Sequence, residues 1–143
     1  IMLRVVLDTN VLVSGLLSSG GICNQIIRRW VNGEFILCIC KETIEELEKV
    51  VRYPNIAKRH KLSEDEMRHY IEYLEEFALK VNITEIIDVI KADRSDNIFP
   101  ACALESGADY IVSGNYHLLD LKLYKSTKII TPRKFYDILS NQG

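Results

Sequence analysis

Short apolar runs alternate along the chain with longer segments in which apolar residues recur every three or four positions. Short runs are typical of buried strands, and the longer periodic segments are typical of helices packed on one face. The short runs predict strands at 3–7, 35–40, 110–112 and 128–131, and a further short strand within 81–89. The periodic segments predict helices at 11–17, 22–31, 41–52 and 63–79, one that opens at 93–97 and ends near 106, and one that starts at 132.

This alternation of strands and helices is the order expected of a parallel sheet with helices on both faces. We therefore predict an α/β fold, a three-layer α/β/α sandwich around a central, mainly parallel sheet. The length of 143 residues suits one hydrophobic core rather than two. We expect a single domain that spans residues 2–141, without repeats or linkers.

Local signals mark several of the predicted helix ends. Ser63 is suited to cap the helix at 63–79, and Glu66 three residues later completes a capping box. Pro54 is expected to end or kink the helix at 41–52. Pro132 directly after the last strand suits the first turn of the terminal helix.

Composition indicates a globular protein, with 48% hydrophobic and 27% charged residues. No apolar run approaches the roughly 18 residues that span a bilayer, and the first residues do not resemble a secretory signal. We therefore expect a cytoplasmic protein with no membrane partner. The net charge of −2 argues against a protein that coats nucleic acid by neutralising phosphates, although an enzyme could still reach RNA through bound cations.

Cysteine usage points to no metal or redox motif. The spacing of Cys38 and Cys40 is that of neither a zinc knuckle nor a redox pair, and both lie in an apolar run. Free cysteine behaves as a small apolar side chain. We expect Cys23, Cys38, Cys40 and Cys102 to be buried, inert thiols.

Acidic and polar side chains follow the predicted strands. Asp8 comes directly after the first strand, and residues 113–115 follow the strand at 110–112. Asp96 lies at a helix start just before that strand, and Glu46 lies on the helix after the second strand. Ligands of open α/β sheets bind outside the carboxyl ends of the strands, so these groups could converge there. Such a cluster suits Mg²⁺ or Mn²⁺, which prefer hard oxygen ligands.

Several segments, in this order, resemble the PIN-domain family, and in particular its branch of toxins from toxin–antitoxin pairs. The resemblance covers about Arg4 to Leu139. The matching segments are VVLDTNVLVS at 5–14, EELEKV at 45–50, DRSDN at 93–97, GADYIVSGN at 107–115 and HLL at 117–119.

The resemblance implies a metal site and the residues that hold it. Asp8, Glu46 and Asp96 match the family's acidic ligands, which bind Mg²⁺ or Mn²⁺ and act in catalysis, with Glu45 as the alternative to Glu46. At the fourth position, where the family commonly has aspartate, this chain has Asn115. Asparagine offers a neutral carbonyl oxygen, so we expect weaker metal affinity and better support of activity by Mn²⁺ than by Mg²⁺.

Neighbouring polar residues are expected to support the ligands. Thr9 and Asn10 suit hydrogen bonding to the carboxylates, and Asp93 suits an outer position beside Asp96. Purely structural roles remain open for several of these groups: Asp8, Asp93 and Asp96 are good helix caps on any fold, Glu46 could be a solvated charge, and Asn115 could be a turn residue.

The implied function is a metal-dependent endoribonuclease that hydrolyses single-stranded or structured RNA, as the toxin of a toxin–antitoxin pair. Its expected partners are RNA, an antitoxin protein and a second copy of the chain in a homodimer. The alternative is a catalytically weak or inactive PIN-like module that binds RNA or a protein. A phosphotransfer enzyme with Asp8 as nucleophile would need an aspartate two residues later, where this chain has Asn10.

Basic residues and histidines elsewhere in the chain could also contribute to function. Six basic residues could form a rim that faces RNA, although solvated surface charge is the favoured explanation for each of them: Arg28, Arg29, Arg52, Lys58, Arg59 and Lys61. The three histidines are scattered, and we expect all of them to be surface or packing residues.

Overall fold

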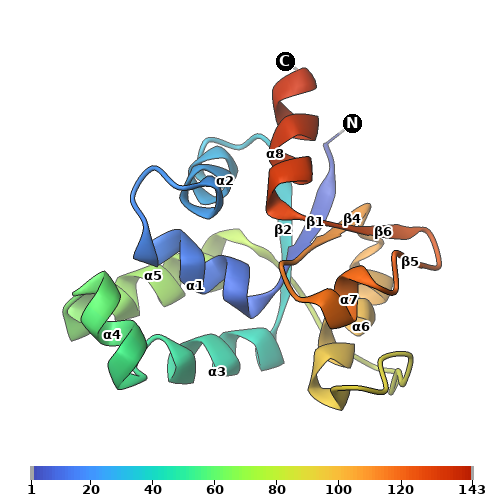
Figure 1. Ribbon diagram of the computed structural model, residues 1–143, viewed down its shortest axis with the longest axis horizontal. Coiled ribbons are helices and arrows are strands. Elements are labelled where there is room, and N and C mark those ends of the chain that lie inside the picture. Colours follow the sequence, from blue (N-terminus) through green and yellow to red (C-terminus); the bar gives the residue numbers. More distant parts are fainter. Residues whose placement is uncertain (1, 143) are drawn as a thin grey trace.

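The computed structural model describes residues 2–142, and its centre is a six-stranded sheet in the order β3-β2-β1-β4-β6-β5 (Figure 1). Neighbouring strands are parallel except for β5, which is antiparallel to β6. The strands are β1 (Arg4–Leu7), β2 (Ile36–Cys40), β3 (Leu79–Val81), β4 (Tyr110–Val112), β5 (Leu123–Tyr124) and β6 (Thr127–Ile130). The predicted, mainly parallel sheet is confirmed.

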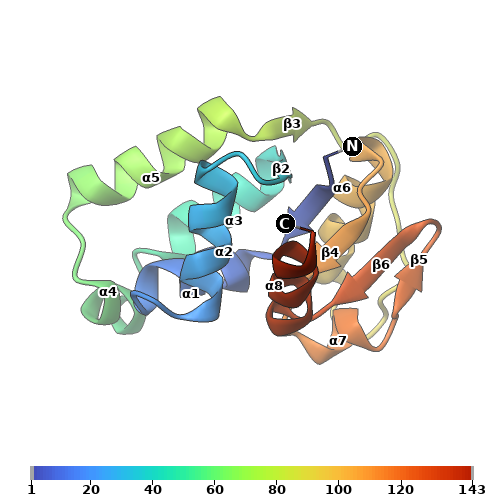
Figure 2. The ribbon, with the colours of Figure 1, turned by 90° about the horizontal axis from the view of Figure 1, so that it is seen from above.

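Helices cover both faces of this sheet. They are α1 (Thr9–Leu17), α2 (Ile22–Val31), α3 (Lys41–Val50), α4 (Pro54–His60), α5 (Glu64–Phe77), the short 3₁₀ helix η1 (Arg94–Asn97), α6 (Ile98–Ser106), α7 (Tyr116–Leu119) and α8 (Pro132–Asn141). Figure 2 shows α1, α2, α3 and α5 on one side of the sheet and α6 on the other. Leu118 of α7 packs in the same core cluster as Phe99 and Cys102 of α6. The three-layer α/β/α sandwich is therefore confirmed.

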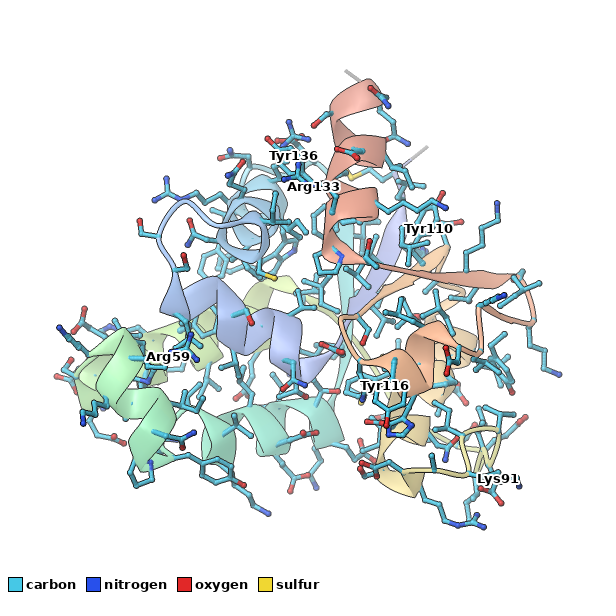
Figure 3. The ribbon with its side chains drawn as sticks, in the orientation of Figure 1. Arg59, Lys91, Tyr110, Tyr116, Arg133 and Tyr136 are labelled. Carbon is cyan, nitrogen blue, oxygen red and sulfur yellow. The ribbon has the colours of Figure 1, made fainter. Side chains whose placement is uncertain are left out.

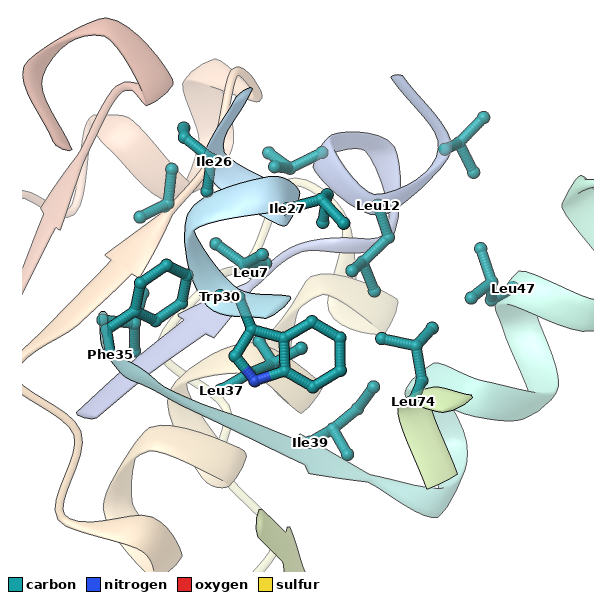
Figure 4. Packing of buried hydrophobic residues seen from close by; sticks show 14 of the residues in the cluster. Leu7, Leu12, Ile26, Ile27, Trp30, Phe35, Leu37, Ile39, Leu47 and Leu74 are labelled. Atoms are coloured by element: carbon teal, nitrogen blue, oxygen red, sulfur yellow. The ribbon is translucent and has the colours of Figure 1, made fainter. Parts of the chain in front are cut away.

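Both faces of the central strands are buried, which explains why these strands are continuous apolar runs in the sequence. In β1, Val5 and Leu7 belong to the larger core cluster and Val6 belongs to the smaller cluster on the other face. In β2, Ile39 and Cys40 divide between the same two clusters. Figure 4 shows part of the larger cluster, around Leu7.

The register of the sheet brings the ends of β1 and β4 together. Leu7 pairs with Val112, so Asp8 and Ser113 are the next residues on adjacent parallel strands. The backbone N–H of Asp8 donates to the carbonyl of Val112 at 3.1 Å. The N–H of Ser113 donates to the carbonyl of Ile130 at 3.0 Å. The two polar residues thus share the carboxyl edge of the sheet.

The strand expected within 81–89 is wrong in position, because β3 ends where that range begins. Val81 pairs with Cys40, the last residue of β2, and α3 starts at the next residue. Beyond Val81 there is consequently no partner strand for residues 82–89, despite their apolar content. The preceding helix α5 ends at Phe77, two residues earlier than expected, because Leu79 already pairs with Cys38.

Pro54 has a different role from the one expected. It occupies the first turn of a separate helix, α4, while α3 ends at Val50 rather than at residue 52. Proline tolerates this position because the N–H that it lacks has no partner in a first turn. The sequence patterns also missed α7 and β5, which are too short to show a hydrophobic period. The single helix expected from 93–97 to about 106 is divided into η1 and α6. The capping box of Ser63 and Glu66 is present as predicted.

The first two helices pack closely at a sharp bend of 100°. A Cβ added at Gly15 of α1 would lie 2.9 Å from Cγ1 of Ile27 on α2, so the glycine permits this approach. Among the described residues, no single helix has the length and apolar character of a membrane span, and only α1 and α2 taken together pass that test, on length and composition alone.

The four cysteines are free thiols. Cys38, Cys40 and Cys102 are buried as expected, whereas Cys23 is only half-buried. Cys40 and Cys102 belong to the core cluster between the sheet and α6, which suits the role of small apolar side chains.

Candidate active site

Asp8 is a buried carboxylate between β1 and α1, with an exposed fraction of 2%. It caps α1, since its Oδ1 accepts a hydrogen bond from the backbone N–H of Val11 at 2.8 Å. Burial raises the pKa of its carboxyl above the usual value, and the nearby carboxylates of Asp96 and Glu46 raise it further, while hydrogen bonds from Ser113 and Val11 oppose the rise. Asp8 therefore combines a capping role with a carboxylate that is costly to ionise.

Ser113 is the partner of Asp8 that sequence reasoning did not select. Its side chain is fully buried, and its hydroxyl donates a hydrogen bond to Oδ2 of Asp8. The same hydroxyl oxygen accepts the backbone N–H of Asn115 at 2.9 Å. The only signal in the sequence was a polar residue directly after a buried strand. That signal becomes specific once β4 is known to lie beside β1.

Asn115 connects this arrangement to Asp96. Its amide Nδ2 donates to Oδ2 of Asp96 at 2.9 Å, and its Oδ1 accepts the backbone N–H of His117 at 3.0 Å. These two partners define the amide orientation, because the opposite orientation would face the NH₂ group with another donor. The carbonyl oxygen that was predicted as a metal ligand thus caps α7, and the amide nitrogen of Asn115 supports Asp96.

Asp96 is a second buried carboxylate, in the 3₁₀ helix η1. Burial raises the pKa of its carboxyl and the charge of Asp93 adds to this rise, whereas the hydrogen bond from Asn115 and the nearby His117 lower it. Asp8, Ser113, Asn115 and Asp96 consequently form one hydrogen-bonded chain, which we call the carboxylate chain. The prediction that Asp8 and Asp96 converge is consistent with this chain.

Asp93 is exposed and acts as the cap of η1. Its Oδ1 accepts the backbone N–H of Ser95 at 3.1 Å and the Ser95 hydroxyl at 2.6 Å, and these bonds lower the pKa of its carboxyl. The outer position expected beside Asp96 is compatible with this placement, since the Asp93 charge acts on Asp96.

Two neighbouring glutamates of α3 have different surroundings. The carboxylate of Glu46 raises the pKa of Asp8 through its charge. Glu45 instead lines a hollow of about 550 Å³ on α3 together with Glu48 and Glu75. The side chain of Glu46 is exposed, so it is free to change rotamer. Of these two glutamates, only Glu46 is among the groups whose charge acts on Asp8.

The hydrogen bonds expected from Thr9 and Asn10 to the carboxylates are not found among residues 2–142, where the oxygens of Asp8 accept the N–H of Val11 and the hydroxyl of Ser113. The Thr9 hydroxyl oxygen is buried and has no hydrogen-bond partner within the described chain. Asn10 is exposed and lines a small hollow near Gly114.

The acidic groups do not form a closed metal cage. Within residues 2–142, no group of three or more histidine, cysteine, aspartate or glutamate side chains is placed to hold a metal ion. The donor chemistry nevertheless suits a hard divalent cation. Asp8 and Asp96 supply carboxylate oxygens whose ionisation is opposed by burial, Glu46 is an exposed third carboxylate, and the Thr9 hydroxyl lacks a partner within residues 2–142. A bound cation would relieve the repulsion among these groups.

Three of the six basic residues that could face RNA are ion-paired or lie away from this site. Arg29 and Arg52 form ion pairs with Glu34 at 3.7 Å and with Glu64 at 2.8 Å. Figure 3 shows Arg59 on α4, far from Tyr116 beside the carboxylate chain. These arginines therefore do not offer free charge next to Asp8.

His60 is a packing residue, as expected. Its Nδ1 accepts the backbone N–H of Leu62 at 2.9 Å, so its Nε2 carries the proton and donates to the carbonyl of Val51 at 2.8 Å. The ring thereby ties the end of α4 to the end of α3.

Comparison with known proteins gives a family and a fold. Residues 4–117 match the model of the PIN domain family. The crystal structure of PAE2754 from Pyrobaculum aerophilum is similar, with a TM-score of 0.61 and 15% sequence identity, over 98% of this chain and 91% of that chain. At this identity the likeness concerns the fold alone. No match was found among curated proteins.

Proposed function

Because this chain belongs to the PIN domain family, whose members are generally nucleases, we propose that it is a metal-dependent endoribonuclease that hydrolyses phosphodiester bonds of single-stranded or structured RNA. The observation that carries the proposal is the carboxylate chain, which holds Asp8 and Asp96 together at the carboxyl edge of the sheet. Both carboxyls have raised pKa values, and perturbed groups of this kind concentrate at functional sites.

Asp8, Asp96 and Glu46 would hold Mg²⁺ or Mn²⁺ in this proposal. When bound, such a cation supplies an activated water and stabilises the oxygen that leaves the phosphodiester. The protein contributes by positioning its ligands: Ser113 orients the Asp8 carboxylate and Asn115 orients that of Asp96. Outer hydrogen bonds of this kind set the direction in which a ligand presents its oxygens.

The alternative function is a PIN-like module that binds RNA or a protein without cutting. It is favoured by Asn115, which replaces a fourth carboxylate by a neutral group whose carbonyl oxygen is already engaged by His117. The absence of a closed acidic cage within residues 2–142 also favours it. Cleavage measurements separate the two functions.

A matched pair of glutamate variants tests the enzyme. We expect wild type to cut labelled single-stranded RNA in Mn²⁺, more weakly in Mg²⁺ and not in chelator. Glu46→Gln removes a ligand charge and is expected to lower the cleavage rate by at least about tenfold, since even outer partners of a metal contribute about 10- to 100-fold. Glu45→Gln, which alters the neighbouring hollow on the same helix, is expected to cut like wild type.

The outcomes distinguish the proposals clearly. Equal loss in both variants would show that the choice of Glu46 is wrong. Intact RNA binding without cutting by wild type in either metal would support the binding module. Cutting that persists in chelator would exclude the metal mechanism.

Asn115→Asp is expected to change stability in opposite directions with and without metal. The new carboxylate loses the donor that faces Asp96 and places a like charge there, so the melting temperature should fall in chelator. In Mn²⁺ the added charge should strengthen metal binding by about tenfold, in line with the loss of a single partner at metal sites. Thermal denaturation at a series of Mn²⁺ concentrations measures both effects. Unchanged metal affinity and an unchanged cleavage rate would contradict this role of Asn115.

We extend the proposal to a toxin that an antitoxin protein neutralises, and to a homodimer. The support is the resemblance of the segments at 5–14 and 107–115 to that branch of the family. Induced expression of wild type should arrest bacterial growth, and a variant without cleavage should not. Light scattering of the purified protein decides between monomer and dimer.

A further inference from the structure

Tyr116 is an exposed aromatic side chain directly beside the carboxylate chain. It follows Asn115, whose amide donates a hydrogen bond to Asp96. Tyr116 itself is 66% exposed. It belongs to neither core cluster. Figure 3 shows Tyr116 near the ends of the strands, on the side of the site where α7 begins. Packing of the fold therefore does not account for a large aromatic ring at this position.

The ring is held in place although it is exposed. It lies against the ring of His117, with centroids 4.2 Å apart and planes tilted by 36°. Asn115 caps α7, and the backbone N–H of Leu118 donates to the Asn115 carbonyl at 3.1 Å. Leu118 is fully buried and anchors the short helix in the core. Tyr116 thus presents a preorganised aromatic face at low entropic cost to a ligand.

The surface next to this ring pair is hollowed and combines apolar with polar residues. A hollow of about 270 Å³ is lined by His117, Asp120, Leu121 and residues 89–92 of the preceding loop. Lys91 and Asp120 bring opposite charges to this lining, and Nζ of Lys91 is paired with Oδ2 of Asp88 at 2.9 Å. The balance suits a neutral heterocycle with donors and acceptors rather than an anion, and the volume lies just below the roughly 300 Å³ at which pockets for drug-sized ligands begin.

We propose that Tyr116 is a stacking platform for an unpaired nucleobase of the single-stranded nucleic acid bound at the carboxylate chain. Aromatic side chains bind single strands in this way because every base has a face that can stack, whereas paired bases of a duplex are not available. The proposal rests on the proposed nuclease function and adds that the substrate is single-stranded next to the bond that is cut. RNA and DNA both fit this chemistry.

Binding of short labelled oligonucleotides in chelator tests the platform without cleavage. We expect Tyr116→Ala to weaken binding of a single-stranded RNA roughly tenfold, as for the loss of one stacked base. Tyr116→Phe should bind within about twofold of wild type, because it keeps the ring. Tyr116→Leu should resemble Tyr116→Ala, because it keeps apolar area without an aromatic face. Tyr53→Ala is the matched control, since Tyr53 is 50% exposed on the surface before α4 and should not affect binding.

Abasic substitutions and a DNA arm identify the contact. One abasic position should weaken binding to wild type and cause no further loss in Tyr116→Ala, because both changes remove the same stack. If the protein contacts the base alone, Tyr116→Ala should weaken the binding of RNA and of DNA with the same sequence by a similar factor. A loss confined to RNA would indicate contact with the ribose 2′-hydroxyl and would overturn a pure stacking role.

The stacking role of Tyr116 and the nuclease function can be supported or rejected independently of each other. Binding that depends on the ring at residue 116, in a protein that cuts nothing, would support the platform and reject the endoribonuclease. RNA cleavage with an unchanged affinity and KM in Tyr116→Ala would reject the platform and keep the enzyme. Equal binding of single strands and duplexes, or no binding by wild type at all, would also overturn the inference.

Discussion

Replacing Asp8 with asparagine is expected to reduce metal-dependent RNA cleavage by about 100-fold or more, because a direct ligand should matter at least as much as the outer partners of a metal. Asparagine keeps the shape of the side chain, and its oxygen can still accept the N–H of Val11. The capping of α1 should therefore survive while the charge is lost. Asp137→Asn is a matched control, because Asp137 is an exposed aspartate on α8.

The same variant should be more stable than wild type in chelator at neutral pH. Burial raises the pKa of Asp8 in the folded protein, so the folded state holds its proton to higher pH than the unfolded chain does. As pH rises from the ordinary value of 3.8 through the raised folded pKa, ionisation of Asp8 costs stability. The variant has no such cost. Its advantage should be small at about pH 4 and largest above the folded pKa.

Thermal denaturation across this pH range, with and without Mn²⁺, measures the effect. Saturating Mn²⁺ should stabilise wild type by mass action and should stabilise Asp8→Asn much less. An Asp8→Asn variant that is less stable than wild type in chelator at pH 7 would show that the carboxylate is structural. RNA cleavage at the wild-type rate would remove Asp8 from the site.

Asn97→Ala is expected to lower the free energy of unfolding by about 3 kcal/mol, since it removes buried hydrogen bonds and leaves backbone groups without partners. Asn97 is buried at the end of η1 and makes four hydrogen bonds. Its Oδ1 accepts the N–H groups of Val89 and Ile90 at 3.0 and 2.9 Å. Its Nδ2 donates to the carbonyls of Ile90 and Arg94 at 2.9 and 3.0 Å.

This asparagine fastens the irregular loop before η1 to the start of α6, and Asp96 is its neighbour in the chain. Loss of Asn97 should therefore also reduce metal-induced stabilisation, since Asp96 loses its rigid support. Urea denaturation measures the first effect and the Mn²⁺ dependence of the melting temperature measures the second. Asn55→Ala, at an exposed position of α4, is the matched control. If the free energy of unfolding fell by less than about 1 kcal/mol, the net value of a single hydrogen bond, the stabilising role of the four hydrogen bonds of Asn97 would be contradicted.

Short-range features of the fold were predictable from the sequence because they depend on neighbouring residues. Buried strands such as β1 and β4 appear as apolar runs, and Ser63 with Glu66 forms a capping box over three residues. Asp8 after the first strand, and a helix opening near Asp93, follow from the same local patterns. The resemblance to the PIN-domain family, which rests on several segments in a fixed order along the chain, is confirmed.

Contacts between distant segments were decided only by the tertiary structure. Asp8 and Ser113 are 105 residues apart in sequence, so no local pattern could pair them before β1 was known to lie beside β4. The end of β3 at Val81 depends on where β2 ends, a property of its partner rather than of residues 82–89.

The carboxylate site shows the same division. Its acidic residues could be selected from the sequence, because their types and positions after strands are local properties. The orientation of Asn115 toward Asp96, and the different surroundings of Glu45 and Glu46, required the packed structure. Side-chain chemistry is encoded residue by residue, whereas the direction in which each group points is imposed by the elements packed around it.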